Sequence, residues 1–326
     1  MSDWRYRLAS NRPTLIAFAF FVAMFAIYAA NHPAGFSANV VQTAANKGVL
    51  LALVAMAQTC AVITAGIDLS VGAVFVLSNC LASSIVVGTA SSAAAGAAGV
   101  LIAGAACGAL NGLIIIIGRL QPIVTTIATG AVFSGLALIL RPTPGGDVYE
   151  PLADALTGRV FGVAPASLVA LAVVVLVVWV PYARSPIGRA AYAIGSSEPA
   201  AYMSGVPVAR AKFLAYVLAG LLASIGGLFL TFVTYSGEAS AATAGSYTLY
   251  SIAAVVLGGV SLYGGSGSAV GAIFGALMFR TIGDLLFVFN LDPLWQPLFQ
   301  GLVLLAAVSL GAARLFRVRN RLELFL

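Results

Sequence analysis

Few side chains in this sequence could do chemistry, and three of them are charges inside or beside long apolar runs: Asp68, Arg280 and Asp284. A charge in such a place is unfavourable unless it has a partner, so it indicates a functional group. Asp68 comes just before Ser70, between two apolar runs. Its carboxylate can cap the helix that follows, the interpretation we favour, or it can join Ser70 in a gate or contact a solute.

Arg280 and Asp284 are four residues apart in FRTIGDLL and therefore share one helix face. Opposite charges at that spacing can neutralise each other, and an arginine beside a carboxylate also suits sugar hydroxyls or an anionic solute. We expect a pair that lies on a solute path or, alternatively, one that only lies near the external membrane interface. The single histidine, His32, leaves no Ser-His-Asp set, so we expect no catalytic site and no metal site in this chain.

The elements that carry these groups are apolar and long. Hydrophobic residues make up 61% of the 326 residues and charged residues 8%, which indicates an integral membrane protein that is all-α. A crossing needs about 20 helical residues. Ten candidate spans satisfy that length approximately: 14–30, 46–65, 70–88, 92–118, 122–141, 166–183, 212–234, 247–262, 267–289 and 295–313. The third, eighth and tenth are the hardest to delimit, because few helix breakers divide them from their neighbours.

Basic residues are unevenly placed around these spans, and Lys/Arg excess marks cytoplasmic loops. We therefore expect one transmembrane domain over 1–326 with both termini cytoplasmic, including an N-terminal segment 1–13 and a tail 314–326. Nucleic acid binding is not expected. The cytoplasmic set is Arg5, Arg7, Arg12, Arg119, Arg184, Arg189, Arg210, Lys212, Arg314, Arg317, Arg319 and Arg321. The external set is Lys47, Arg141 and Arg159.

The longest polar interval on the cytoplasmic side, residues 184–211, predicts a coupling loop that contacts a partner. Within it, 196–203 reads as a short helix that a serine caps and that Gly205 and Pro207 end. We expect Glu198 to offer a charge to the partner, and Ala200, Ala201 and Tyr202 an apolar anchor. The predicted coupling residues are Ser196, Ser197, Glu198, Pro199, Ala200, Ala201, Tyr202, Met203 and Gly205.

Two sets of glycines, each spaced by four residues, predict close helix packing. They lie in the fourth and ninth spans, which alternate crossings would orient in opposite senses. This pattern favours two five-helix halves in inverted repeat, with chance repetition as the alternative. The glycines are Gly104, Gly108 and Gly112, and Gly267, Gly271 and Gly275.

The external loop 141–165 carries Asp147, Glu150 and Asp154 among turn formers. It is either a docking surface or a solvated connector, and the loop 235–247 is a candidate to share its role.

Three stretches, in this order, resemble the ribose-type permeases of bacterial ABC importers: AGIDLSVGAV (65–74), GRAAYAIGSSEPAAYMSGV (188–206) and IAAVVLGGVSLYGGSGSAVGAIFGAL (252–277). The resemblance runs from about residue 14 to 310. It implies an inner-membrane permease with the type II architecture of the vitamin B12 importer. It also implies a dimer, two cytoplasmic ATPase subunits that bind ATP and Mg, and a periplasmic binding protein that delivers a monosaccharide or sugar derivative.

The sequence departs from that family in three places. Thr248 and Tyr250 stand where acidic residues are usual, Ser196-Ser197 replaces a Gly-Asn type pair, and the region of Arg280 is usually neutral. The last change leaves room for a modified or charged sugar. A homodimer is the default expectation and a heterodimer with a second permease the alternative. The rival function is a stand-alone, ion-coupled carrier or channel for a small polar solute.

Overall fold

The computed structural model describes residues 12–306 and residue 309. The expected basic residues Arg5, Arg7, Arg314, Arg317, Arg319 and Arg321 lie outside the described residues. So do the tail 314–326 and nearly all of segment 1–13.

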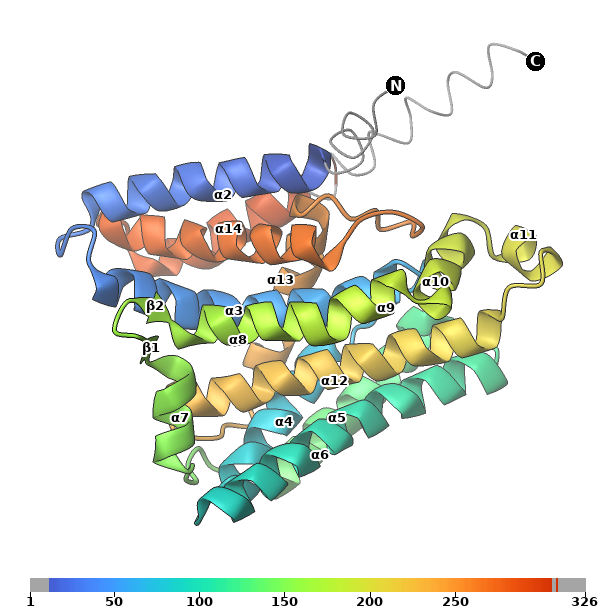
Figure 1. The fold of residues 1–326 in the computed structure, drawn as a ribbon, viewed down its shortest axis with the longest axis horizontal. Coiled ribbons are helices and arrows are strands. Elements are labelled where there is room, and N and C mark those ends of the chain that lie inside the picture. Colours follow the sequence, from blue (N-terminus) through green and yellow to red (C-terminus); the bar gives the residue numbers. More distant parts are fainter. Residues whose placement is uncertain (1–11, 307–308, 310–326) are drawn as a thin grey trace, which may run out of the picture.

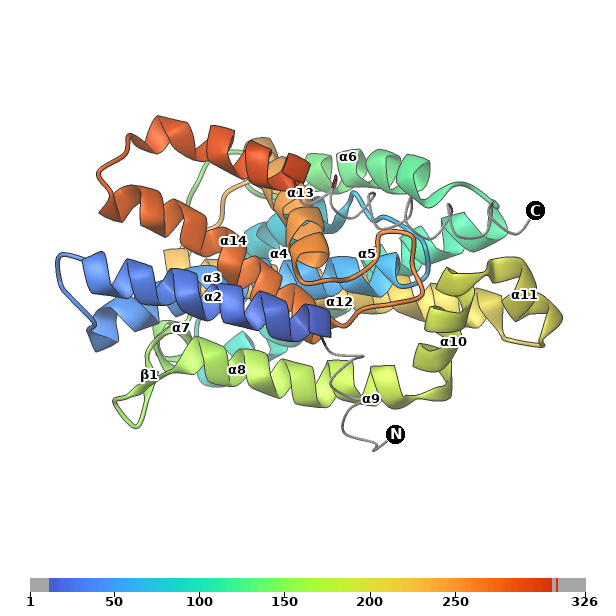
Figure 2. The ribbon, with the colours of Figure 1, turned by 90° about the horizontal axis from the view of Figure 1, so that it is seen from above.

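Long helices that lie side by side form the body of the molecule (Figures 1 and 2). Seven helical segments of the described chain are long and apolar enough to cross a membrane. Six of them are α2 (Arg12–Asn31), α3 (Ala38–Val62), α5 (Ala90–Ile117), α6 (Pro122–Leu140), α12 (Val208–Thr234) and α14 (Ala269–Val288). The seventh is a continuous run of α8 (Ala166–Val174), the π-helical η1 (Val175–Trp179) and α9 (Val180–Arg184). The π turn precedes Pro181, which has no N–H to continue a regular α-helix.

Three shorter apolar helices correspond to the spans that were hardest to delimit. They are α4 (Val71–Ile85), α13 (Ala241–Leu257) and the segment Gln296–Ala306 that follows η2 (Pro293–Trp295). The expectation of an all-helical membrane protein is therefore confirmed, and seven of the ten expected spans are helices of sufficient length.

Two helices begin earlier than the sequence analysis expected, because serine caps decide their starts. Ser37 accepts the N–H of Val40 and begins α3 at Ala38, whereas the expected span began at 46. Ser240 accepts the N–H of Thr243 at 3.1 Å and begins α13 in the same way.

The two ends of the molecule carry different elements (Figure 1). One end, here called the coupling end, carries α10 (Pro186–Ser196) and α11 (Glu198–Met203). The other, the far end, carries α7 (Glu150–Thr157) and a hairpin of β1 (Arg159–Val160) and β2 (Ala164–Pro165), in which Arg159 pairs with Pro165. Neither α7 nor the hairpin was expected in the loop 141–165.

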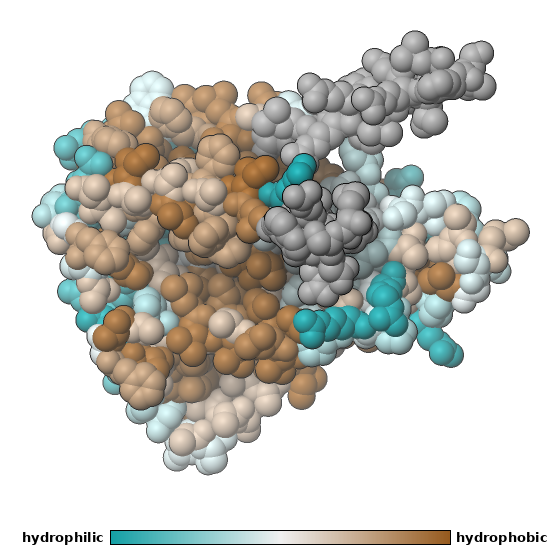
Figure 3. All heavy atoms as spheres, turned by 45° about the horizontal axis from the view of Figure 1, so that its top comes forward, coloured by the Kyte–Doolittle hydropathy of each residue, from teal (hydrophilic) through white to brown (hydrophobic). Residues whose placement is uncertain are grey.

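The core is organised around α3, which is buried on every side from Gly48 to Val62. It packs against α12, α14, α13 and α4. A helix that is apolar all round belongs in the middle of such a bundle. The outer helices α2 and α6 instead expose large apolar side chains such as Phe20 and Ile139. Figure 3 shows apolar side chains over the middle of one face and hydrophilic residues towards its two ends.

The glycines spaced by four residues contact neighbouring backbones. A Cβ on Gly108 of α5 would lie 2.1 Å from the carbonyl oxygen of Tyr216 in α12. A Cβ on Gly271 of α14 would lie 2.3 Å from the carbonyl oxygen of Gly258, directly after α13. Both contacts are closer than a side chain allows, so each pair of helices meets at a point where only glycine fits.

Candidate coupling and gate site

The predicted short helix is present as α11, and its ends have local causes. Ser197 accepts the N–H of Ala200, Pro199 lies in the first turn, and Gly205 adopts φ +75° directly after the helix. A second helix, α10, precedes it and was not expected. It begins where Ser185 accepts the N–H of Gly188 at 2.9 Å.

The apolar face of α11 points partly into its own chain. Ala201 is buried in a cluster with Ala190 and Ile194 of α10 and with Ala211 of α12. The expectation that Ala201 anchors a partner is therefore wrong, because the side chain already has its contacts. The exposed apolar groups are Tyr202 and Met203, with exposed fractions of 71% and 85%, and Ala200 is exposed as well.

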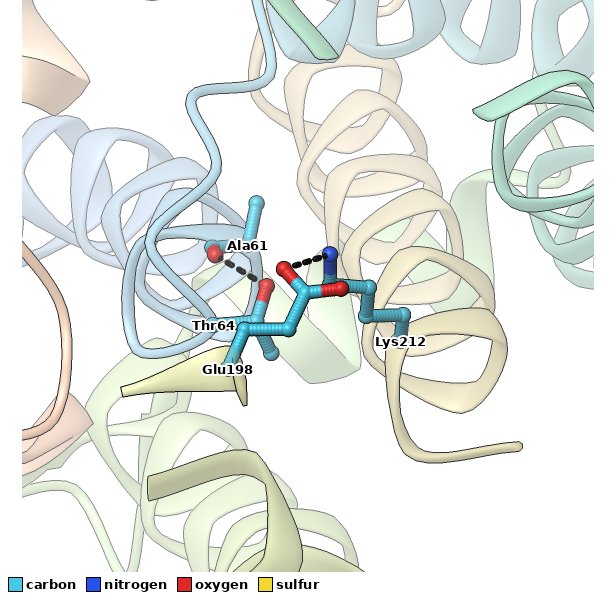
Figure 4. Close-up of polar contacts among 4 residues, drawn as sticks. All are labelled: Ala61, Thr64, Glu198 and Lys212. Carbon is cyan, nitrogen blue, oxygen red and sulfur yellow. Dashed lines mark hydrogen bonds and ion pairs between the residues drawn. The ribbon is translucent and has the colours of Figure 1, made fainter. Parts of the chain in front are cut away.

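Glu198 also has a partner within the chain. Its Oε2 lies 2.6 Å from Nζ of Lys212, near the start of α12 (Figure 4). This is the only ion pair among residues 12–306, and the Glu198 side chain is still half exposed, so its role as a charge offered to a partner stays a prediction. Exposed pairs of this kind contribute about 0.2 to 1 kcal/mol, enough to orient α11 on α12 without fixing it.

The end of α10 is wedged between two loops. A Cβ on Gly195 would lie 2.0 Å from the carbonyl oxygen of Ile63 and 2.3 Å from the backbone nitrogen of Gly265. The Tyr192 hydroxyl donates to the carbonyl oxygen of Gly267 at 2.8 Å, and burial, with a smaller effect of Cys60, raises the pKa of Tyr192 to about 12. The hydroxyl therefore keeps its proton at neutral pH. This contact joins α10 to loop 63–70, which follows α3, and to loop 258–268, which follows α13.

Loop 63–70 ends in a buried polar cluster. Oδ1 of Asp68 accepts the backbone N–H of Ser70 at 2.9 Å and its hydroxyl at 2.6 Å. Nδ2 of Asn111 in α5 donates to the Ser70 hydroxyl oxygen at 2.7 Å, and the Thr129 hydroxyl in α6 donates to Oδ1 of Asn111 at 2.6 Å. All four residues are buried, with Asp68 exposed by only 2%. We call Asp68, Ser70, Asn111 and Thr129 the Asp68 cluster.

The backbone N–H groups at the start of α4 find hydrogen-bond acceptors on neighbouring helices as well as on Asp68. The N–H of Leu69 donates to the Thr126 hydroxyl of α6 at 2.9 Å, and the N–H of Gly72 donates to the Thr248 hydroxyl of α13 at 3.1 Å. Thr248, one of the departures from the family pattern, thus contacts the AGIDLSVGAV stretch directly. The carboxylate performs the capping role considered in the sequence analysis, and it does so at a point where α5, α6 and α13 converge on α4.

One hydroxyl beside this cluster lacks a partner. The buried Tyr216 hydroxyl of α12 has no hydrogen-bond partner within the part of the chain that the structure describes. It lies so close to Gly66 that a Cβ there would approach it to 2.4 Å. Buried donors are almost always satisfied, so this group indicates a place for a water molecule or for a partner in another state of the loop.

Sequence reasoning missed Asn111, Thr126, Thr129 and Tyr216. The available signal was the recurrence of polar side chains on one face of otherwise apolar helices, since such groups hydrogen-bond between membrane helices.

Arg280 and Asp284 lie elsewhere, in α14 towards the far end. They form no ion pair within the described chain, which corrects the expectation of a mutually neutralising pair. Both line a cavity of about 520 Å³ between α2, α3 and α14, and no member of the Asp68 cluster reaches it. The two groups of candidate residues are therefore separate sites.

The two external loops of the sequence analysis meet at the far end. Gly145 and Gly237 exchange backbone hydrogen bonds of 3.0 and 2.8 Å. The Arg141 guanidinium donates to the carbonyl oxygen of Ser83 at 2.9 Å, and Asp154 accepts from the Tyr235 hydroxyl, which raises the pKa of that tyrosine. The loops thus form one surface, whose exposed carboxylates include Glu150, Asp154 and Glu238.

Comparison with known proteins gives a consistent result. Residues 40–308 match the family described as branched-chain amino acid transport system, permease component. The ribose import permease of Bacillus subtilis is 38% identical over 266 residues, 79% of this chain and 80% of the relative. The ribose import permease of Escherichia coli is 35% identical over 262 residues, with the same coverage. The autoinducer 2 import system permease of Klebsiella pneumoniae is 34% identical over 307 residues, 93% of this chain and 87% of the relative. No solved structure matches the chain significantly.

Proposed function

The chain belongs to the permease component family of ABC importers, and on that premise we propose that it forms the translocation pathway for a monosaccharide or sugar derivative. The relatives named for ribose and autoinducer 2 import support this class of solute. The observation that carries the mechanism is the contact of Gly195 with Ile63 and Gly265, which links α10 and α11 to the loop that holds Asp68.

Family membership implies ATPase partners and a periplasmic binding protein. We propose that ATP and Mg are bound by the ATPase subunits, and that Tyr202 and Met203 are the apolar groups that the ATPase covers. In the dimer we expect a second copy of this chain, with a heterodimer as the alternative. A stand-alone, ion-coupled carrier is disfavoured, because the similarity to the named import permeases covers 79% and 93% of this chain.

The proposed architecture is ten crossings in two inverted halves of type II. Helix packing supports it. Span two (α3) packs on span nine (α14), and span seven (α12) packs on span four (α5), as an exchange of halves requires. The sequence before the third and eighth spans agrees, with Asp68-x-Ser70 before α4 and Glu238-x-Ser240 before α13. The glycines do not share this symmetry, because α5 presents them to α12 and α14 presents them to α13.

We further propose that the coupling end faces the cytoplasm. The described basic residues of the expected cytoplasmic set are at or beside helix termini: Arg12, Arg119, Arg184, Arg189, Arg210 and Lys212. The positive-inside rule then orients the chain with α7 and the hairpin outside.

The proposed mechanism is mechanical. When the ATPase subunits close, they displace α11, and α10 moves with it because Ala201 packs on Ala190 and Ile194. Gly195 leaves no space against Ile63, so the displacement reaches loop 63–70. Asp68 and Ser70 then shift against Asn111. The gate, which in this proposal is the Asp68 cluster, thereby switches between two alternative arrangements. Arg280 and Asp284 as solute contacts stay a prediction.

The test is transport by the complete importer in proteoliposomes that contain the matching binding protein and candidate sugars. Ribose, a sugar phosphate and a sugar acid form the first panel. The proposal expects ATP-dependent uptake of at least one sugar. Uptake driven by an ion gradient without ATPase subunits would contradict it.

A further inference from the structure

Two hollows of different character adjoin each other on the outside of α14. The first is the polar cavity already described, and the second is an apolar groove of about 590 Å³ between α2, α3, α8 and α14. Arg280 and Asp284 line both. A polar cavity at the far end of the helices thus continues into an apolar groove along their length.

The polar cavity has an excess of positive charge. Lys47 of α3 and Arg280 of α14 contribute two permanent cations, Asp284 contributes one carboxylate, and His32 adds an imidazole. The Nε atom of Arg280 is buried and has no hydrogen-bond partner among the described residues. A buried guanidinium donor without a partner, on a residue that lines a cavity with net positive charge, fits an anionic oxygen.

The groove is lined by apolar side chains apart from Arg280, Thr281 and Asp284 at one end. Its lining includes Phe21 and Phe25 of α2, Ala172 of α8 and Leu176 of η1. Leu176 is 64% exposed, so the groove opens on the surface that crosses the membrane. A sugar would leave such a groove unfilled, whereas an acyl chain fills it.

We propose that the two hollows together bind one anionic phospholipid. Its phosphate lies between Lys47 and Arg280, and one acyl chain lies in the groove between α2 and α8. Asp284 lines both hollows but forms no ion pair with Arg280 among the described residues, so the guanidinium donors are available to the phosphate. With α7 and the hairpin outside, the lipid belongs to the outer leaflet of the inner membrane. The site lies between α2 and α14. Its occupant in this proposal is a lipid and not the transported sugar, so a lipid site is the alternative to the predicted role of Arg280 and Asp284 as solute contacts.

The experiment measures lipid retention by the full-length permease in complex with its ATPase subunits. The complex is equilibrated with phosphatidylglycerol or phosphatidylcholine of identical chains, delipidated in detergent and weighed by native mass spectrometry. We expect phosphatidylglycerol to remain bound and to exceed phosphatidylcholine at least tenfold. The double variant Lys47→Gln and Arg280→Gln loses this preference. Glycerol 1-phosphate, the head group without chains, does not compete at the same concentration.

The groove is tested with a matched pair of variants on α8. Ala172→Phe fills the groove from an exposed position, and Val173→Phe adds the same ring one residue further, outside the groove lining. Retention falls in the first and is unchanged in the second. Equal retention of both lipids, or equal retention in all variants, overturns the proposal. So does displacement of the lipid by glycerol 1-phosphate or by a transported sugar, or release of lipid only when two permease copies separate.

Discussion

The backbone N–H of Gly265 donates a hydrogen bond of 3.1 Å to the carbonyl oxygen of Ile63, although the two residues belong to loops 202 positions apart. This bond joins loop 258–268 to loop 63–70, and Gly195 of α10 sits against both partners. A displacement of α10 is therefore expected to act on both loops.

The first prediction concerns this contact. Gly195→Val places a side chain within 2.0 Å of the Ile63 carbonyl oxygen, so the backbones must separate. We expect about 1 to 3 kcal/mol of destabilisation and a loss of coupling between ATP hydrolysis and transport. Ala193→Val, at an exposed position of the same helix, is the control. Melting temperature and solute-stimulated ATP hydrolysis measure the two effects, and normal stimulation in Gly195→Val would show that α10 does not transmit the movement.

The second prediction separates the two roles of Asp68. Asp68→Ala leaves the N–H and hydroxyl of Ser70 without their acceptor, so we expect about 1 to 3 kcal/mol of lost stability. Asp68→Asn keeps an acceptor oxygen and should cost less. If Asp68→Asn folds normally but stops transport, the charge belongs to the gate; if it transports normally, the carboxylate only caps α4.

The third prediction tests helix packing. Gly108→Leu and Gly271→Leu each force a side chain into a backbone carbonyl, and we expect poor expression and a lower melting temperature in both. Gly135→Leu in α6 is the matched control, since nothing lies within 4 Å of its added Cβ. Comparable losses in all three variants would mean that the effect is not one of close packing.

The fourth prediction concerns the surface offered to the ATPase. Replacing both Tyr202 and Met203 by Ala removes exposed apolar groups, and we expect weaker co-purification with the ATPase, by roughly 2 kcal/mol or more of binding free energy. Glu198→Gln breaks only an exposed ion pair, so the complex should survive with a loss of at most about 1 kcal/mol. Ala201→Arg should instead disrupt the packing of α11 on α10. If the double variant co-purifies normally, the ATPase does not cover these side chains.

The fifth prediction is the orientation. The test uses a protein whose native cysteines are replaced and that carries a single new cysteine. A cysteine at Asp147 should react with an impermeant maleimide in intact cells, whereas one at Ser197 should react only after permeabilisation. The reverse pattern would invert the proposed topology, and labelling of both from outside would mean that the one segment between them, Ala166–Arg184, does not cross the membrane.

The sequence predicted those structural features that depend on residues close together in the chain. The helix α11 could be placed because its serine cap, Pro199 and Gly205 all lie within nine residues. The start of α3 was expected too late, at residue 46, because hydropathy alone does not reveal that Ser37 caps the helix. The length of the apolar runs was enough to identify seven long helices.

The rest of the candidate site depends on contacts between distant segments. Asn111 reaches Ser70 across 41 positions, and Thr248 reaches Gly72 across 176. The polar residues can be noticed in the sequence, but their partners cannot be assigned from it, because a polar residue in an apolar helix looks the same whether it faces a partner or a neighbouring carbonyl. The burial of Ala201 is similar: its partners come from both flanking helices, so its exposure could not be inferred from α11 alone.

The helix α4 is held at its start and near its middle. At its start Asp68 accepts the N–H of Ser70, the residue directly before α4. Near its middle Nδ2 of Asn79 donates to the Ser236 carbonyl oxygen while its Oδ1 accepts the N–H of Glu238, in the loop that pairs with Gly145. A helix held in this way can couple the two regions in both directions, because the coupling free energy between two binding sites is reciprocal. If docking outside shifts α4, the ATPase senses a loaded binding protein, and the nucleotide state must in turn alter by the same factor how tightly that protein is held.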